Sequence, residues 1–165
     1  MEINWLIQVI AAIIPLLIGA VWYNPKVFGK VVMDANTGSK QGHPAAVFGG
    51  ALVLGIVLSF TYKFLGDHHY AFQTFFRPEA EHGVGVDVAS PFGIQLKELI
   101  DGYGTRFHSW THGLAHSLIV SFFILLPVMA INDLFEGRSF KYFITVWGYW
   151  AITIATMYML LAQWG

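Results

Sequence analysis

The chain has 165 residues, of which 56% are hydrophobic and only 12% are charged, and its mean hydropathy is +0.58. Soluble globular domains carry about twice that share of charge. A net charge of −1 excludes a basic surface for nucleic acid, and the absence of cysteine excludes disulfides, thiolate metal sites and cysteine nucleophiles.

Four long segments contain no Asp, Glu, Lys or Arg, and each predicts a transmembrane helix. They cover residues 3–23, 44–62, 107–132 and 142–165. At about 1.5 Å of rise per residue, such helices are about 28–39 Å long and match a hydrocarbon core of about 30 Å. We therefore expect an all-α polytopic membrane protein. It would be a four-transmembrane-helix bundle in a single membrane domain, residues 1–165, with spans at about 3–23, 44–64, 107–132 and 142–164.

The three connections between these helices differ in length and charge. Residues 24–43 contain three lysines and one aspartate, and the nine residues 133–141 are short enough to make an antiparallel hairpin of the last two helices. We expect the long loop, about 65–106, to be partly ordered, with a short amphipathic stretch from Ile94 to Tyr103. Lys and Arg are slightly more numerous on the side of the two shorter connections. This bias places the termini and the long loop in the periplasm.

Small residues recur at a spacing of four within the helices. Helix association in lipid depends on close backbone approach, so we expect such stripes at helix–helix contacts. The packing stripes are Ala51, Gly55 and Ser59 on the second helix and Gly113, Ser117 and Ser121 on the third.

Three histidines at the start of the third helix are the most informative polar residues. His108, His112 and His116 step by four, which predicts one helical face that runs from the interface to about two turns inside. Ionisable groups at membrane depth are expensive and normally face a protein interior or a wet cavity. These histidines are therefore candidates for function.

Three roles are open for this histidine stripe. It can hold Zn²⁺, Cu²⁺ or haem iron through neutral imidazoles, it can relay protons or sense pH, or it can tie helices together by hydrogen bonds. It lacks the glutamate of HExxH, so it offers no recognised metalloprotease base. A pair formed by His112 and His116 would be completed by His108 or by groups of the long loop. The loop candidates are His68, His69, Glu79, Glu81 and His82.

A second cluster of polar and aromatic residues lies at the opposite membrane face. It combines the hairpin before the last helix, where Glu136 and Arg138 can pair, with the segment in which a proline ends the first helix. We expect its members to make structural or partner contacts. They are Trp22, Tyr23, Pro25, Glu136, Arg138 and Lys141.

Three motifs in this order resemble those of the DUF1761 family of small bacterial membrane proteins. Residues 19–30 resemble its G-x-x-W-Y-x-P-x-x-F-G opening, residues 112–116 its H-G-x-x-H-G motif, and residues 134–141 with 148–150 its L-F-E-x-[RK]-x-x-K…G-Y end. Ser117 departs from the pattern, which has Gly after the second histidine. The resemblance implies a four-span inner-membrane protein but no activity, because the family has no established one. The positions that it marks are Trp22, Tyr23, Pro25, His112, His116, Glu136, Arg138 and Lys141.

The sequence favours a function without catalysis. No catalytic constellation is visible, and four helices leave little interior for a substrate path. We expect an accessory or scaffold subunit that contacts membrane lipid and packs against itself or other integral membrane proteins, with no nucleic acid and no cofactor. The alternative is a metal- or haem-binding membrane protein, or a transporter or enzyme protomer, that uses His108, His112 and His116 to hold Zn, Cu or haem.

Overall fold

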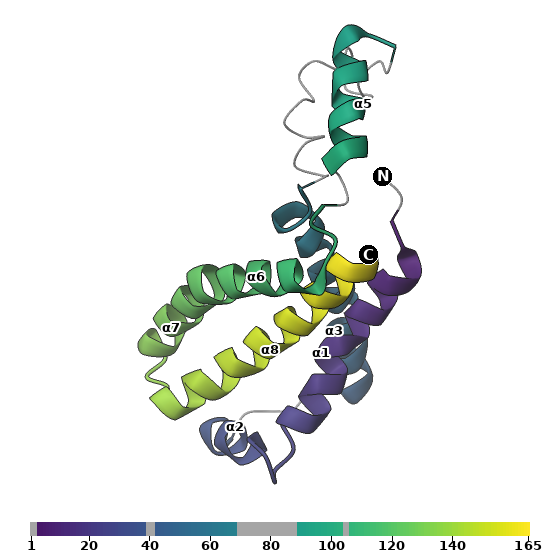
Figure 1. Ribbon diagram of the computed structural model, residues 1–165. Helices are drawn as coiled ribbons and strands as arrows, with labels where there is room; N and C mark the ends of the chain where they lie inside the picture. Colours follow the sequence, from purple (N-terminus) through teal and green to yellow (C-terminus); the bar gives the residue numbers. More distant parts are fainter. Residues whose placement is uncertain (1–2, 39–41, 69–88, 104–105) are drawn as a thin grey trace.

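The protein is an all-α bundle in the computed structural model, which describes residues 3–38, 42–68, 89–103 and 106–165 (Figure 1). No strand occurs in those ranges. The helices in chain order are α1 (Trp5–Trp22), α2 (Gly29–Ala35), α3 (Pro44–Leu65), α5 (Pro91–Tyr103), α6 (Trp110–Val120), the π-helical turn η3 (Ser121–Leu125), α7 (Leu126–Phe135) and α8 (Phe140–Trp164).

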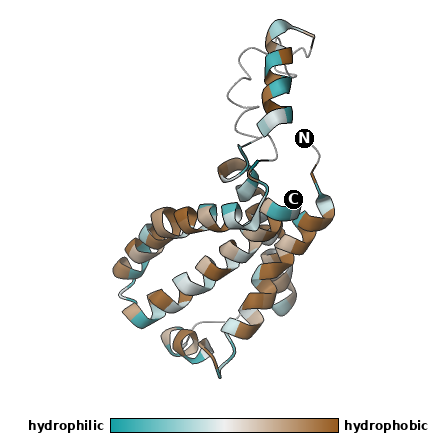
Figure 2. Ribbon diagram, viewed as in Figure 1, coloured by the Kyte–Doolittle hydropathy of each residue, from teal (hydrophilic) through white to brown (hydrophobic). Residues whose placement is uncertain are grey.

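Four of the described helices are long and apolar enough to cross a membrane. They are α1, α3, the continuous helix Trp110–Phe135 formed by α6, η3 and α7, and α8. Large apolar side chains point away from the bundle, as Leu6, Leu54 and Phe123 do, and Figure 2 shows apolar residues along all four helices. An outward apolar surface is what a lipid solvent requires. The expected four-helix membrane architecture is therefore confirmed.

The bundle consists of two close helix pairs, α1 with α3 and α6 with α8, which are joined by a contact between α1 and α8. A Cβ at Gly55 would collide with the carbonyl oxygen of Ala12, and a Cβ at Gly113 would collide with that of Tyr158. Ser59 and Ser117, one turn further along each stripe, are fully buried. The two small-residue stripes thus lie at two different helix contacts, because only a residue without a large side chain lets the backbones approach this closely.

Helix α8 provides the centre of the core. Its Ile154, Met157, Tyr158 and Leu161 are almost completely buried and pack with Ala11 of α1. The hydroxyl of Tyr158 donates a hydrogen bond to Thr61 Oγ1 of α3 at 3.0 Å. Through α8, the two helix pairs become one packed unit.

A π-helical turn interrupts the third transmembrane helix shortly before Pro127. Proline donates no backbone hydrogen bond and its ring clashes with the preceding turn, so the helix widens locally. The carbonyl oxygen of Ser121, the last residue of its stripe, accepts a hydrogen bond from Trp147 Nε1 of α8 at 3.1 Å. This contact holds the widened turn against α8.

The connections contain more helix than their composition alone indicates. Helix α2 lies within residues 24–43, and α5 covers the amphipathic stretch of the long loop and extends beyond one end of the bundle (Figure 1). Gly137 adopts a φ of +65°, which favours glycine, and makes the turn between α7 and α8. The third transmembrane helix begins later than residue 107, because Ser109 caps it by accepting a hydrogen bond from the His112 N–H.

Candidate metal centre

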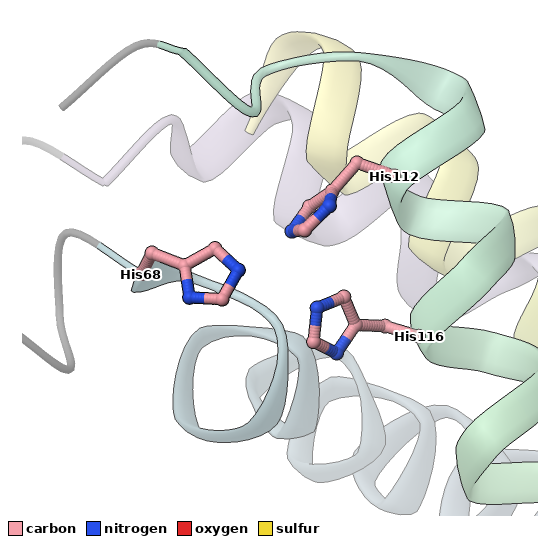
Figure 3. Close-up of side chains that lie close together, drawn as sticks. All are labelled: His68, His112 and His116. Carbon is pink, nitrogen blue, oxygen red and sulfur yellow. The ribbon is translucent and has the colours of Figure 1, made fainter. Parts of the chain in front are cut away.

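Three histidines from two distant chain segments meet at the end of the bundle that carries α5. His68 follows α3, whereas His112 and His116 lie on α6. One ring nitrogen from each of these histidines lies within 4.8 Å of the other two. The centroids of the His112 and His116 rings are 4.4 Å apart, and those of His68 and His112 are 4.9 Å apart. Figure 3 shows the three rings pointing toward one another. We call this group the histidine cluster.

Helix α6 positions two of the rings through its packing on α8. Gly113 and Ser117 face α8 at close range. His112 and His116 each precede one of these small residues, so they lie on a neighbouring face, which adjoins the end of α3. Rotation of α6 would replace Gly113 with a larger side chain against the backbone of Tyr158, where even a Cβ does not fit, so helix packing sets the orientation of both rings.

A buried ion pair at the end of α3 positions the third ring. Lys63 Nζ lies 3.1 Å from Asp67 Oδ2, and both side chains are less than 10% exposed. The backbone N–H groups of Gly66 and Asp67 both donate to the carbonyl oxygen of Tyr62, which tightens the last turn of the helix. Asp67 is therefore anchored to α3, and it holds the adjacent His68 near α6.

The last carbonyl groups of α3 face the rings of α6. Nε2 of His112 lies 3.3 Å from the carbonyl oxygen of Gly66, just beyond the end of α3. Such helix-end carbonyls have no partner within their own helix. A histidine that donates one ring N–H to a carbonyl keeps the lone pair of its other nitrogen for a metal ion, which is the usual arrangement around protein metal ligands.

The geometry suits a single metal ion. Two nitrogens bound to one tetrahedral ion at about 2.0–2.1 Å lie about 3.4 Å apart, so the rings must approach one another by up to about 1.4 Å. All three rings are half-buried. Phe107 lies against two of them, with centroid distances of 4.9 Å to His68 and 5.0 Å to His112. Small rotations of the imidazoles would complete the site.

The structure brings His68, and not His108, together with His112 and His116. His108 does not share a helical face with His112 and His116, because α6 begins at Trp110 and His108 precedes its cap. It is exposed and lies outside the histidine cluster. His68 takes its place, one of the five loop groups considered from the sequence. The other four, His69, Glu79, Glu81 and His82, lie outside the described residues.

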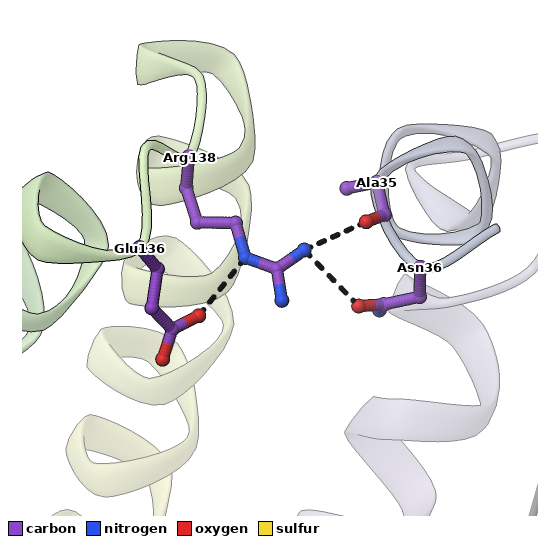
Figure 4. Close-up of polar contacts among 4 residues, drawn as sticks. All are labelled: Ala35, Asn36, Glu136 and Arg138. Atoms are coloured by element: carbon purple, nitrogen blue, oxygen red, sulfur yellow. Dashed lines mark hydrogen bonds and ion pairs between the residues drawn. The ribbon is translucent and has the colours of Figure 1, made fainter. Parts of the chain in front are cut away.

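Arg138 forms the main polar contact at the opposite end of the bundle (Figure 4). Its Nε donates to Glu136 Oε2 at 3.0 Å, and its Nη1 donates to the carbonyl oxygen of Ala35 at 2.6 Å and to Asn36 Oδ1 at 3.3 Å. The hydrogen bond to Glu136 raises the pKa of Arg138 and so stabilises its charge. This Arg138 latch fastens the end of α2 to the α7–α8 hairpin. Lys141 is exposed.

The aromatic residues that close α1 contact α8. Trp22 Nε1 donates to the carbonyl oxygen of Thr145 at 3.0 Å, and the ring of Tyr23 lies 4.9 Å from that of Tyr149. Pro25 is exposed in the connection to α2. Trp22 and Tyr23 therefore serve the internal packing of the chain.

The family comparison covers both ends of the bundle. The family described as "Protein of unknown function (DUF1761)" matches residues 6–162. The chain belongs to this family. No curated protein and no solved structure matches it. Since the DUF1761 description assigns no activity, the function of this DUF1761 protein has to be inferred from the chemistry of its own residues.

Proposed function

We propose that this multi-pass membrane protein binds one divalent transition-metal ion at His68, His112 and His116. The observation that carries the proposal is the convergence of three imidazoles from α6 and from the end of α3, with one nitrogen of each within 4.8 Å of the others. Neutral imidazole is the side chain that binds such ions most often.

Structural hydrogen bonding alone does not account for this arrangement. The carbonyl oxygen of Gly66 lies within hydrogen-bond distance of Nε2 of His112. The other nitrogen of that ring, and the nitrogens that His68 and His116 turn toward it, are left for another partner. At the boundary of an apolar bundle, three polar rings packed against one another are expensive unless something satisfies them. A cation that all three lone pairs share does so.

The cluster favours a bare ion over haem. A haem needs its wide macrocycle beside the ligating ring, whereas the flanks of His112 are taken by Phe107 and His116, with centroids 5.0 and 4.4 Å away. Among divalent ions, Zn²⁺ accepts three histidines in tetrahedral sites and Cu²⁺ binds imidazole most tightly. Zn²⁺ and Cu²⁺ are therefore the proposed ligands.

The location of the cluster indicates the side from which the ion is supplied. The end of α3 and the start of α6, which carry the histidine cluster, lie at the same end of the bundle as α5, the start of α1 and the end of α8 (Figure 1). In an inner membrane, the Lys and Arg of the other end, among them Lys26, Lys30 and Arg138, would face the cytoplasm. The proposed metal site would then open to the periplasm. Impermeant maleimide labelling of Glu98→Cys but not of Thr37→Cys in intact cells tests this orientation, since the chain has no other cysteine.

An accessory role without catalysis, with other membrane proteins or a second copy as partners, stays a prediction. The apolar outer surface of the four spans is what lipid requires, so it does not by itself favour a protein partner. Mass spectrometry of gently solubilised protein tests that prediction separately from metal binding.

Metal analysis of the full chain in lipid nanodiscs tests the proposed function. Purified apo protein titrated with Zn²⁺ or Cu²⁺ should take up one ion per chain, measured by calorimetry and elemental analysis. His68→Ala and His116→Ala should abolish this uptake. His43→Ala, at the far end of α3, and His108→Ala are matched controls that should retain it. Full binding by the double variant His68→Ala/His116→Ala would contradict the proposal, and a Soret band would redirect it to haem.

A further inference from the structure

We propose that the metal ion clasps the two ends of the extramembrane segment between α3 and α6, and that its binding thereby fixes the position of α5. This inference rests on the proposed function. The histidine cluster would then have a second role, because the position of α5, outside the bundle, would depend on whether an ion is bound.

The first support is the place of the cluster in the topology. His68 lies where the chain leaves α3, and His112 lies where it enters α6. Helix α3 packs mainly on α1, whereas α6 packs mainly on α8. One hydrogen bond, from His112 to Gly66, and the ring contacts of His68 with His112 and His116 join the two ends. An ion bound by all three histidines would therefore add a strong link exactly where helix packing is sparse.

The second support is a chain of ring contacts that runs from the cluster to α5. Phe107 packs on His68 and His112 at once. The guanidinium of Arg106 lies 5.8 Å from the centroid of the Phe107 ring and 5.9 Å from that of Tyr103, the last residue of α5. A cation at this distance from an aromatic face is attracted to it. Arg106 thus connects the ring that covers the cluster with the end of α5.

Metal binding favours the arrangement in which Phe107 contacts both His68 and His112. Phe107 contacts both rings only while His68 and His112 are close together, and that closeness is what a shared ion enforces. A ligand shifts a conformational equilibrium when it binds one state better than the other. The coupling is reciprocal, so loss of the Phe107 ring must weaken metal binding. Phe107 is a positioning residue for the histidines and a connection to α5.

Distance measurements between two spin labels test the clasp in the full chain. The chain lacks cysteine, so Glu98→Cys on α5 and Leu6→Cys on the lipid-facing side of α1 provide the two label sites. In nanodiscs, Zn²⁺ should narrow the distribution of distances between the labels. Phe107→Ala should bind Zn²⁺ about tenfold more weakly and keep a broad distribution even when saturated. Phe107→Tyr should restore the behaviour of the wild type.

Phe135→Ala is the matched control, because Phe135 is exposed at the opposite end of the bundle. It should leave both Zn²⁺ affinity and the narrowing unchanged. An unchanged distribution in a wild-type chain that binds one Zn²⁺ overturns the clasp and leaves the proposed function intact. Narrowing in Phe107→Ala equal to that in the wild type also overturns it. A wild-type chain that binds no ion overturns the proposed function and the clasp together.

Discussion

Side chains join separate helices at both ends of the bundle, but the donors and acceptors that they use differ. At each end a side chain from one hairpin reaches the carbonyl groups at the C-terminus of another helix: Arg138 reaches Ala35 of α2, and His112 reaches Gly66 beyond α3. Arg138 can only donate, and its partners are a carboxylate, a carbonyl and an amide oxygen. The Arg138 latch is complete without any ligand.

The histidine cluster is not complete in the same sense. A neutral imidazole has one donor and one acceptor nitrogen, so a ring that donates to a carbonyl retains a lone pair. The rings of His68, His112 and His116 face one another (Figure 3), and the ring of His112 has a carbonyl partner, at Gly66. Polar contacts between helix ends therefore indicate a ligand site when several acceptor nitrogens without a donor converge on one point. Contacts that leave no acceptor lone pair to bind a cation, as at the donor-only Arg138 side chain, indicate structure.

The largest expected effect is the loss of a proposed ligand. His116→Ala should weaken Zn²⁺ binding more than about 100-fold, since even loss of a group that merely orients a ligand costs about 10- to 100-fold. At a Zn²⁺ concentration about 100 times the Kd, the wild type should gain about 2.7 kcal/mol in unfolding free energy, and this gain should vanish in the variant. Thermal unfolding with and without Zn²⁺ measures it. Equal stabilisation of both proteins would place the site elsewhere.

The second prediction concerns the buried ion pair beside the cluster. Asp67→Asn removes the carboxylate that pairs with the buried Lys63 ammonium, which should destabilise the fold by about 3–5 kcal/mol. It should also weaken Zn²⁺ binding, because His68 loses its anchor. Asp101→Asn is the matched control, since its ion pair with Lys97 is exposed and should contribute little. Wild-type stability and Zn²⁺ affinity in Asp67→Asn would show that the ion pair neither stabilises the fold nor positions His68.

The third prediction tests whether helix packing orients the rings. Gly113→Ala places a methyl group against the carbonyl oxygen of Tyr158 and should cost about 1–3 kcal/mol through overpacking. Because α6 must shift, Zn²⁺ affinity should fall as well. Gly55→Ala crowds Ala12 at the other helix pair and should lower stability with less effect on affinity. Gly50→Ala, which has open space around it, should be neutral in unfolding and binding assays.

The smallest change in stability is expected from substitutions in the Arg138 latch. Arg138→Met removes the bonds to Ala35 and Asn36, so thermal stability should decrease modestly and protease should gain access near α2. Zn²⁺ affinity should stay at the wild-type value. Arg138→Lys keeps a charge but loses the planar fork, and it should only partly restore stability. Impaired metal binding in Arg138→Met would show that the two ends are coupled.

Local patterns were enough to predict the membrane architecture and the close helix contacts. Uncharged runs long enough to span a bilayer correspond to the four long helices, and Gly55 and Gly113 lie where backbones approach each other. The start of α6 at Trp110 was harder to predict. His108, His112 and His116 are spaced by four in the sequence whether or not the helix extends back to His108. The cap at Ser109 was the available signal, since serine is a preferred helix-capping residue.

Hydropathy and helical periodicity, which are properties of neighbouring residues, were enough to predict four helices that can cross a membrane and a face shared by His112 and His116. Only the tertiary structure decided that His68 joins them and that His108 does not. That choice depends on where the end of α3 meets α6. The Lys63–Asp67 pair is local, but contacts through α8 also set this meeting point, and those contacts join residues that no local pattern relates.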